Sequence, residues 1–252
     1  MRTRLPLIAL TMLALIVGPA SADPLVLHCD ASSSYDLTVR SDRWVFDRAG
    51  AAPNRVEIGP GMLLTDGVPV RLNAEDRDRL VLFDRGLRAL LPWIRQVARH
   101  GVDLAALAVR EEASHLQLAP AKREALDQRI AVDAGELRRR IDTSQSTHDW
   151  HADAVRQLGN QFAADLGPIV AGDLGQQALQ AAMSGDLDTA ARLRDQAADL
   201  ATTLQPRIKR RLQALQPQVD ALCPSVDRLA ALQQGLRDAR GRPLRLLEET
   251  GR

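Results

Sequence analysis

The first third of the chain carries a two-residue alternation of hydrophobic and polar positions, which is typical of half-buried β-strands. In the stretches YDLTV, RWVFD and RVEIG, large hydrophobic residues occupy alternate positions. Asp66 and Gly67 separate two further hydrophobic runs and form a favoured pair for a two-residue turn, because glycine accepts a positive φ without a Cβ clash. We therefore predict a small antiparallel sheet with a hairpin over about residues 24–72.

From Asn73 onward the hydrophobic spacing changes to alternating steps of three and four, which is typical of an amphipathic α-helix. Asn73 itself is a good N-cap residue. Pro92 lies inside the hydrophobic seam and removes one backbone hydrogen bond, so we expect a kink or break over residues 88–92. Gly101 predicts a second stop or bend.

The rest of the chain is also helical in its pattern. Further helices are predicted at about residues 120–141, 148–166, 174–222 (interrupted by a Ser-Gly-Asp sequence and two prolines) and 225–239. The predicted fold class is α+β and mostly helical, with a small N-terminal antiparallel sheet packed on a bundle of long, proline-interrupted helices. We expect one domain over residues 23–252, made of a β part (about 24–72) and a helical part (about 73–249).

The N-terminus predicts export. Arg2 and Arg4 precede an apolar run over residues 5–17, which small residues follow up to Ala22. This order is typical of a cleavable secretory signal peptide, and the run is shorter than the roughly 20 residues of a transmembrane helix. We therefore predict a signal peptide over residues 1–22, a periplasmic location and no transmembrane span.

The chain contains two cysteines, Cys29 and Cys223. In an oxidising compartment such a pair favours one intramolecular disulfide. The alternative is a pair of free or intermolecular thiols. The spacing excludes a CxxC redox motif.

The charge balance gives no indication of a nucleic-acid partner, since 33 basic and 32 acidic side chains nearly cancel. Two basic runs, over residues 138–140 and 207–211, are interpreted as the solvated sides of amphipathic helices.

The sequence HDWHAD holds the candidate metal ligands His148 and His151, one helical turn apart. Two imidazoles in this relation can share a metal ion, but a structural site needs two more ligands, and no motif elsewhere in the sequence offers them. The competing interpretation is a polar helix start with exposed histidines. We therefore predict no metal and no cofactor.

No catalytic residue is predicted, because the motifs GxSxG, HExxH, GxGxxG and the P-loop do not occur. The non-enzymatic hypothesis is an envelope protein that contacts a protein partner through its helical faces. The alternatives are a holdase-like or lipid-binding carrier with a Leu/Ala-lined cleft, and an enzyme whose unrecognised site joins His100 or His115 to a carboxylate. The oligomeric state is not predicted.

The stretches GMLLTDGVPVRLNAED and LRALLPWIRQVARHGVDLAALAV resemble the YggN-like family of exported bacterial proteins of unknown function. The placement of one cysteine near each end of the mature chain is also similar. The resemblance implies export and a hairpin followed by helices, and it supplies no catalytic residues. The matching positions are Asp66, Gly67, Leu72, Arg88, Pro92, Gly101, Leu104 and Ala105.

Overall fold

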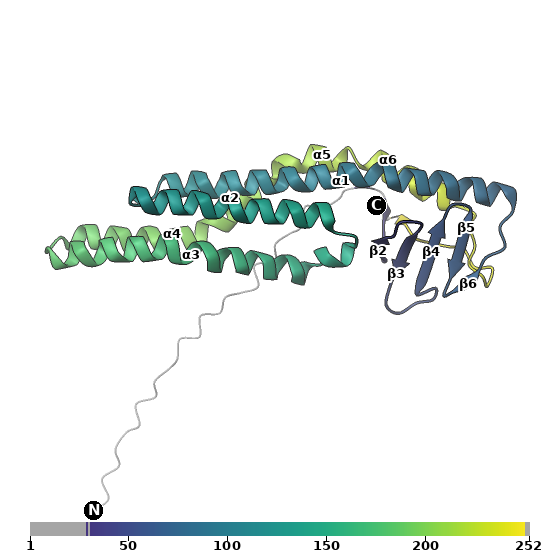
Figure 1. The fold of residues 1–252 in the computed structure, drawn as a ribbon, viewed down its shortest axis with the longest axis horizontal. Coiled ribbons are helices and arrows are strands. Elements are labelled where there is room, and N and C mark those ends of the chain that lie inside the picture. Colours follow the sequence, from purple (N-terminus) through teal and green to yellow (C-terminus); the bar gives the residue numbers. More distant parts are fainter. Residues whose placement is uncertain (1–28, 30, 250–252) are drawn as a thin grey trace, which may run out of the picture.

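The structure, a computed structural model, describes residue 29 and residues 31–249, and it places a small sheet at one end of a set of long helices (Figure 1). This arrangement confirms the predicted α+β, mostly helical fold class. The predicted signal peptide, residues 1–22, lies outside the described residues. The helices are α1 (Ala74–Ser114), α2 (Pro120–Thr143), α3 (Ala152–Met183), α4 (Leu187–Leu212), α5 (Gln216–Asp220) and α6 (Cys223–Gln233), with the 3-10 helices η1 (Thr147–Trp150) and η2 (Gln213–Leu215).

The main sheet is antiparallel and has the strand order β2-β3-β4-β5-β6. Asp66 and Gly67 form the turn between β5 and β6, with φ of 50° and 77°, and Thr65 pairs with Val68 across it. Pro69 lies in β6, an edge strand, where its missing N–H costs no ladder bond. The strands are β2 (Asp36–Val39), β3 (Trp44–Asp47), β4 (Arg55–Gly59), β5 (Met62–Thr65) and β6 (Val68–Pro69); β1 (Ala31–Ser32) pairs separately with β7 (Glu248–Glu249).

The first hydrophobic cluster lies between the sheet, the first half of α1, α6 and the segment after α6. Asn73 starts α1 by accepting a 2.7 Å hydrogen bond from Asp76 N, as its N-cap role requires. Trp44, Phe83 and Leu80 are almost completely buried here. The buried members of this cluster are Tyr35, Trp44, Phe46, Val56, Ile58, Leu63, Leu80, Phe83, Leu87, Leu90, Leu222, Leu229, Leu236, Leu244 and Leu246.

A second hydrophobic cluster joins the last part of α1 to α2, α3 and α4. Helix α1 contributes to both clusters and is therefore the element that connects them. The hairpin of α3 and α4 continues beyond the ends of α1 and α2, so its far end stands away from the rest of the molecule (Figure 1). The buried members are Val102, Ala106, Ala113, Leu116, Leu118, Leu126, Ile130, Ala134, Ile141, Val170, Leu174 and Leu193.

Pro92 does not break α1 and Gly101 does not stop it, because the helix is continuous from Ala74 to Ser114. Pro92 lies on an exposed side of the helix, while Leu90 before it and Val102 after it are buried in the two clusters. Packing on both sides therefore outweighs one lost backbone bond. A Cβ on Gly101 would lie 3.2 Å from Leu215 Cδ1, so this glycine allows close helix packing instead of ending a helix.

Three other expected helix boundaries are wrong. Helix α3 runs without interruption to Met183, α4 continues through Pro206 to Leu212, and α6 ends at Gln233 instead of about residue 239. Gly235 has φ of 90° and turns the chain away from the helix. The chain then returns toward the sheet, where the Gln233 side chain accepts hydrogen bonds from the backbone N–H groups of Leu246 (2.8 Å) and Leu247 (2.9 Å).

Candidate functional site

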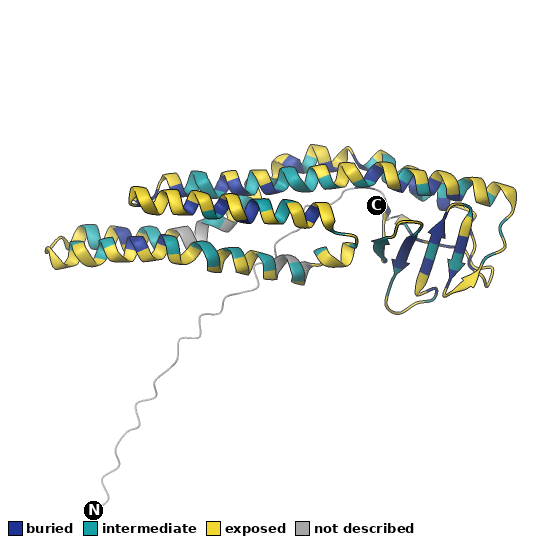
Figure 2. Ribbon diagram, viewed as in Figure 1, coloured by how far each residue is buried: buried dark blue, intermediate teal, exposed yellow. Residues whose placement is uncertain are grey.

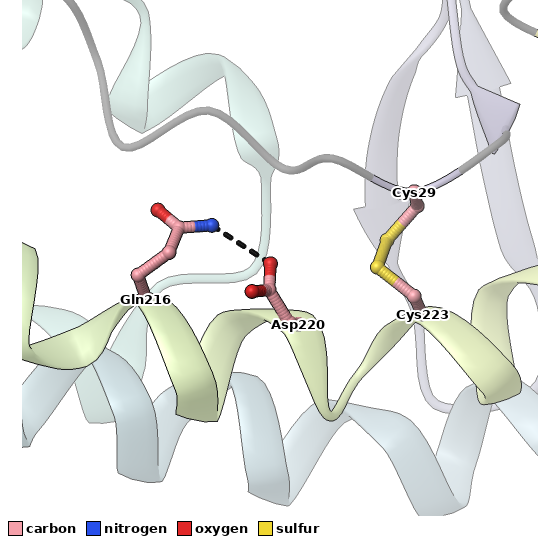
Figure 3. The surroundings of a disulfide bond; sticks show 4 residues. All are labelled: Cys29, Gln216, Asp220 and Cys223. Atoms are coloured by element: carbon pink, nitrogen blue, oxygen red, sulfur yellow. Dashed lines mark hydrogen bonds between the residues drawn. A yellow bond between two sulfur atoms is a disulfide. The ribbon is translucent and has the colours of Figure 1, made fainter.

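The two cysteines form the disulfide bond that the sequence favoured (Figure 3). It joins Cys29, just before β1, to Cys223, the first residue of α6, with a Cα–Cα distance of 4.9 Å. Close by, Gln216 donates a 2.7 Å hydrogen bond to Asp220 within α5 (Figure 3). The disulfide therefore ties the N-terminal end of the described chain to the helix that covers the first hydrophobic cluster.

A second junction joins the sheet to the segment between α2 and α3. Strand β2 is an edge strand, and its free side is occupied by this segment. Val39 N donates a 2.7 Å hydrogen bond to the carbonyl of Gln145, and Leu37 N donates one of 2.8 Å to Thr147 Oγ1. These bonds place η1 beside the first residue of β2.

At this junction the carboxylate of Asp36 meets both predicted histidines. His151 Nε2 lies 2.6 Å from Asp36 Oδ1, and His148 Nδ1 lies 3.5 Å from Asp36 Oδ2. The two imidazole rings are 4.7 Å apart between centroids. One ligand atom from each of the three residues lies within 4.8 Å of the other two. We call Asp36, His148 and His151 the junction triad.

The junction triad contains an ionised carboxylate and is open to solvent. Partial burial raises the pKa of Asp36, but hydrogen bonds with His151, His148 and Thr147 outweigh it and hold this pKa below its usual value. Asp36 is therefore a carboxylate at neutral pH. The His148 and His151 side chains are 73% and 52% exposed, so their ring nitrogens are accessible from outside.

Sequence reasoning identified both histidines of the junction triad and missed Asp36. Asp149, which lies between the two histidines in the sequence, accepts a 3.0 Å hydrogen bond from Ser144 Oγ instead. Asp36 is more than a hundred residues away from the histidines in the chain, and its position in an alternating strand carries no signal for this contact.

The far end of the α3–α4 hairpin carries exposed hydrophobic side chains. Leu179, Met183 and Leu187 are 61%, 81% and 69% exposed, in a region where exposed residues predominate (Figure 2). We call these three residues the hairpin tip. The turn between the helices is fixed by Asp186, which accepts a 3.0 Å hydrogen bond from Thr189 N.

The other histidines of interest are not paired with a carboxylate by any contact in the described part of the chain. His100 Nδ1 lies 3.0 Å from Gln218 Oε1, and His115 is exposed at the end of α1.

The basic run over residues 207–211 takes part in contacts between helices, beyond the solvated role that we expected. Arg207 forms an ion pair with Glu112 at 2.6 Å, and Arg211 forms one with Glu111, so α4 is bound to the end of α1.

In the part of the chain that the structure describes, no helix has both the length and the hydropathy needed to cross a membrane. Comparison with curated proteins and with solved structures found no match. A family model, by contrast, matches residues 29–244, which include both cysteines and all three residues of the junction triad. The chain belongs to the family described as Protein of unknown function (DUF2884).

Proposed function

We propose that this is an exported protein of the bacterial cell envelope that acts by contacting another protein through the hairpin tip. Export is supported by the signal-peptide pattern of residues 1–22 and by the disulfide, which is typical of oxidising compartments. The observation that carries the proposal is the exposure of Leu179, Met183 and Leu187 together at a projecting end of the molecule.

The α3–α4 hairpin is packed along its length and exposes its hydrophobic side chains at its far end. Leu174 of α3 and Leu193 of α4 are buried, which holds the two helices together below the tip. Methionine and leucine side chains adapt to irregular apolar surfaces, and exposed apolar groups gathered in one place mark interaction sites. The partner surface would be an apolar pocket that receives the tip.

The charges beside the tip favour a protein partner over an anionic membrane surface. Asp186 and Asp188 lie in the turn and in the first turn of α4, with one neighbouring positive charge from Arg192. Carboxylates at this position would be repelled by the negative surface potential of anionic lipids. The lipid-carrier alternative therefore has less support at this end of the molecule.

The experiment is photo-crosslinking in intact cells, with a photoreactive amino acid at Met183. The control carries the same amino acid at Gln161, an exposed position in α3 far from the tip. We expect a discrete protein adduct from Met183 that the Gln161 control does not give. Adducts of equal intensity from both positions would contradict the proposal, and a lipid adduct from Met183 would favour the lipid carrier.

Export has its own test. The protein recovered from the periplasmic fraction should begin at Asp23, and alkylation without reductant should label neither cysteine. A full-length cytoplasmic chain would contradict the envelope location.

A further inference from the structure

The junction triad has a ligand set that suits a transition-metal ion. Two imidazoles and one carboxylate are ligands that zinc accepts, whereas calcium and magnesium prefer oxygen ligands alone. The three ligand atoms lie within 4.8 Å of one another. Around a tetrahedral zinc ion with bonds of about 2.0–2.1 Å, ligand atoms are about 3.3 Å apart, so small side-chain rotations suffice.

The backbone around the triad is already held in place by other contacts. Ser146 caps η1 by accepting a 3.2 Å hydrogen bond from His148 N, and it accepts a 3.1 Å bond from Thr38 Oγ1 of β2. His151 occupies the N-cap position of α3, but its side chain makes no capping bond and reaches Asp36 instead.

The carboxylate also has the supporting contact that ligating carboxylates usually have. Thr147 Oγ1 donates a 3.2 Å hydrogen bond to Asp36 Oδ1, while the same hydroxyl accepts from Leu37 N. Such outer contacts orient a ligand before the metal arrives. The exposure of both histidines leaves a path for the ion and room for water or an external ligand at the remaining coordination positions.

We propose that Asp36, His148 and His151 bind one divalent transition-metal ion, with zinc as the reference ion, and that the bound ion fastens the start of α3 to the edge of the sheet. Two of the ligands lie at the start of the α3–α4 hairpin, and the third lies on β2. The ion would therefore link the sheet to the hairpin by metal–ligand bonds, in place of the direct contacts between Asp36 and the two histidines. This inference is independent of the protein contacts proposed above.

The binding test is a calorimetric titration of zinc into the oxidised mature protein, purified without a histidine tag because a tag would itself bind the ion. We expect one zinc ion per chain. His148→Ala should weaken binding by at least about tenfold, as should Asp36→Asn, since loss of even an outer-shell partner typically costs 10–100-fold. The matched control is His115→Ala, which removes an exposed histidine at the end of α1 and should leave the affinity unchanged.

His148→Ala is the informative variant because the contacts of Ser146 and Thr147 with β2 do not involve its side chain. An unchanged circular-dichroism spectrum would show that its effect is local. Asp36→Asn gives an independent second reading from the other side of the junction. No binding by the wild type, or equal affinity in wild type, His148→Ala and Asp36→Asn, would overturn the site.

The fastening is tested separately by hydrogen exchange. The backbone N–H groups of Leu37 and Val39 donate across the junction, so zinc should slow their exchange in the wild type and not in His148→Ala. Zinc binding with unchanged exchange at both amides would overturn the fastening role, and slower exchange in both proteins would overturn the role of His148.

Discussion

Trp44 Nε1 donates a 2.7 Å hydrogen bond to Asp84 Oδ1, and this bond joins strand β3 to helix α1 across the first hydrophobic cluster. Asp84 also pairs with Arg88 at 3.0 Å, and the Arg88 guanidinium lies 5.5 Å from the centre of the Trp44 ring. The indole is 1% exposed. The indole N–H, which is the only polar group of the Trp44 side chain, therefore has the Asp84 carboxylate of another element as its hydrogen-bond acceptor.

Asp84→Ala is expected to destabilise the protein by about 1–3 kcal/mol, because the indole N–H would lose its acceptor inside the protein. Asp84→Asn keeps a side-chain oxygen at the same place and should cost less. Urea unfolding of both variants measures the two free energies of unfolding. Equal losses would show that the hydrogen bond to Trp44 is not what Asp84 contributes.

Two helical glycines should respond in opposite directions to alanine. A Cβ on Gly86 would lie 2.9 Å from Cδ2 of the buried Leu229, whereas a Cβ on Gly172 meets nothing within 4 Å. Alanine improves helix propensity by about 1 kcal/mol at either position, but overpacking costs about 1–3 kcal/mol. We expect Gly172→Ala to raise the melting temperature and Gly86→Ala to lower it. A rise in both would mean that Leu229 yields without cost.

The loop after α6 should stabilise the folded protein at neutral pH, and this stabilisation should be lost in acid. Asp238 is buried and accepts hydrogen bonds from Arg240 N (2.9 Å), Arg242 N (2.9 Å) and Arg242 Nε (2.8 Å). Burial raises the pKa of Asp238, but these bonds and the Arg242 charge outweigh it, so the pKa in the folded protein is lowered.

Because the folded-state pKa lies below the unfolded value of about 3.9, the stabilisation is present above that pH and is lost as the pH falls through the folded-state pKa. Asp238→Asn should therefore be less stable than the wild type at pH 7 by about 1–3 kcal/mol, with the difference shrinking below pH 4. Urea unfolding at pH 7, 5 and 3 measures this difference. A difference that stays constant over this range would contradict the role of the charge.

The elements that local pattern determines could be predicted from the sequence. The turn at Asp66 and Gly67 and the helix start at Asn73 depend on neighbouring residues alone. The continuity of α1 does not, because the packing of Leu90 and Val102 in two separate clusters decides whether Pro92 interrupts the helix. The local sequence indicates the backbone hydrogen bond that Pro92 removes, but it does not indicate the tertiary contacts that offset this loss.

In the junction triad, too, the local sequence pattern predicts only part of the arrangement. His148 and His151 are one turn apart in the sequence and could be recognised as a pair. Asp36 joins them only because the segment after α2 lies along the free edge of β2. One sequence holds no sign of that long-range pairing, just as it holds none of the pairing between β1 and β7.

The two hydrophobic clusters are expected to unfold together, as one cooperative unit. We propose that residues 23–252 are one domain, because α1 contributes buried residues to both clusters and the second junction joins β2 to the start of α3. Backbone amides of β4 then measure the opening of the first cluster, and those of α2 measure the opening of the second. Native-state hydrogen exchange should give their slowest members, near Ile58 and Ile130, the same free energy of opening.

The disulfide between Cys29 and Cys223 allows a second test of this cooperativity. It closes a loop with a sequence separation of 194, for which chain entropy gives up to about 5 kcal/mol. Cys223→Ser should therefore lower the opening free energy by the same amount near Ile58 and near Ile130, although the bond lies beside the first cluster only. It should also bring the melting temperature to that of the reduced wild type. If exchange near Ile58 accelerates while exchange near Ile130 stays unchanged, the clusters unfold separately, because a cross-link that constrains only one unit cannot stabilise the other.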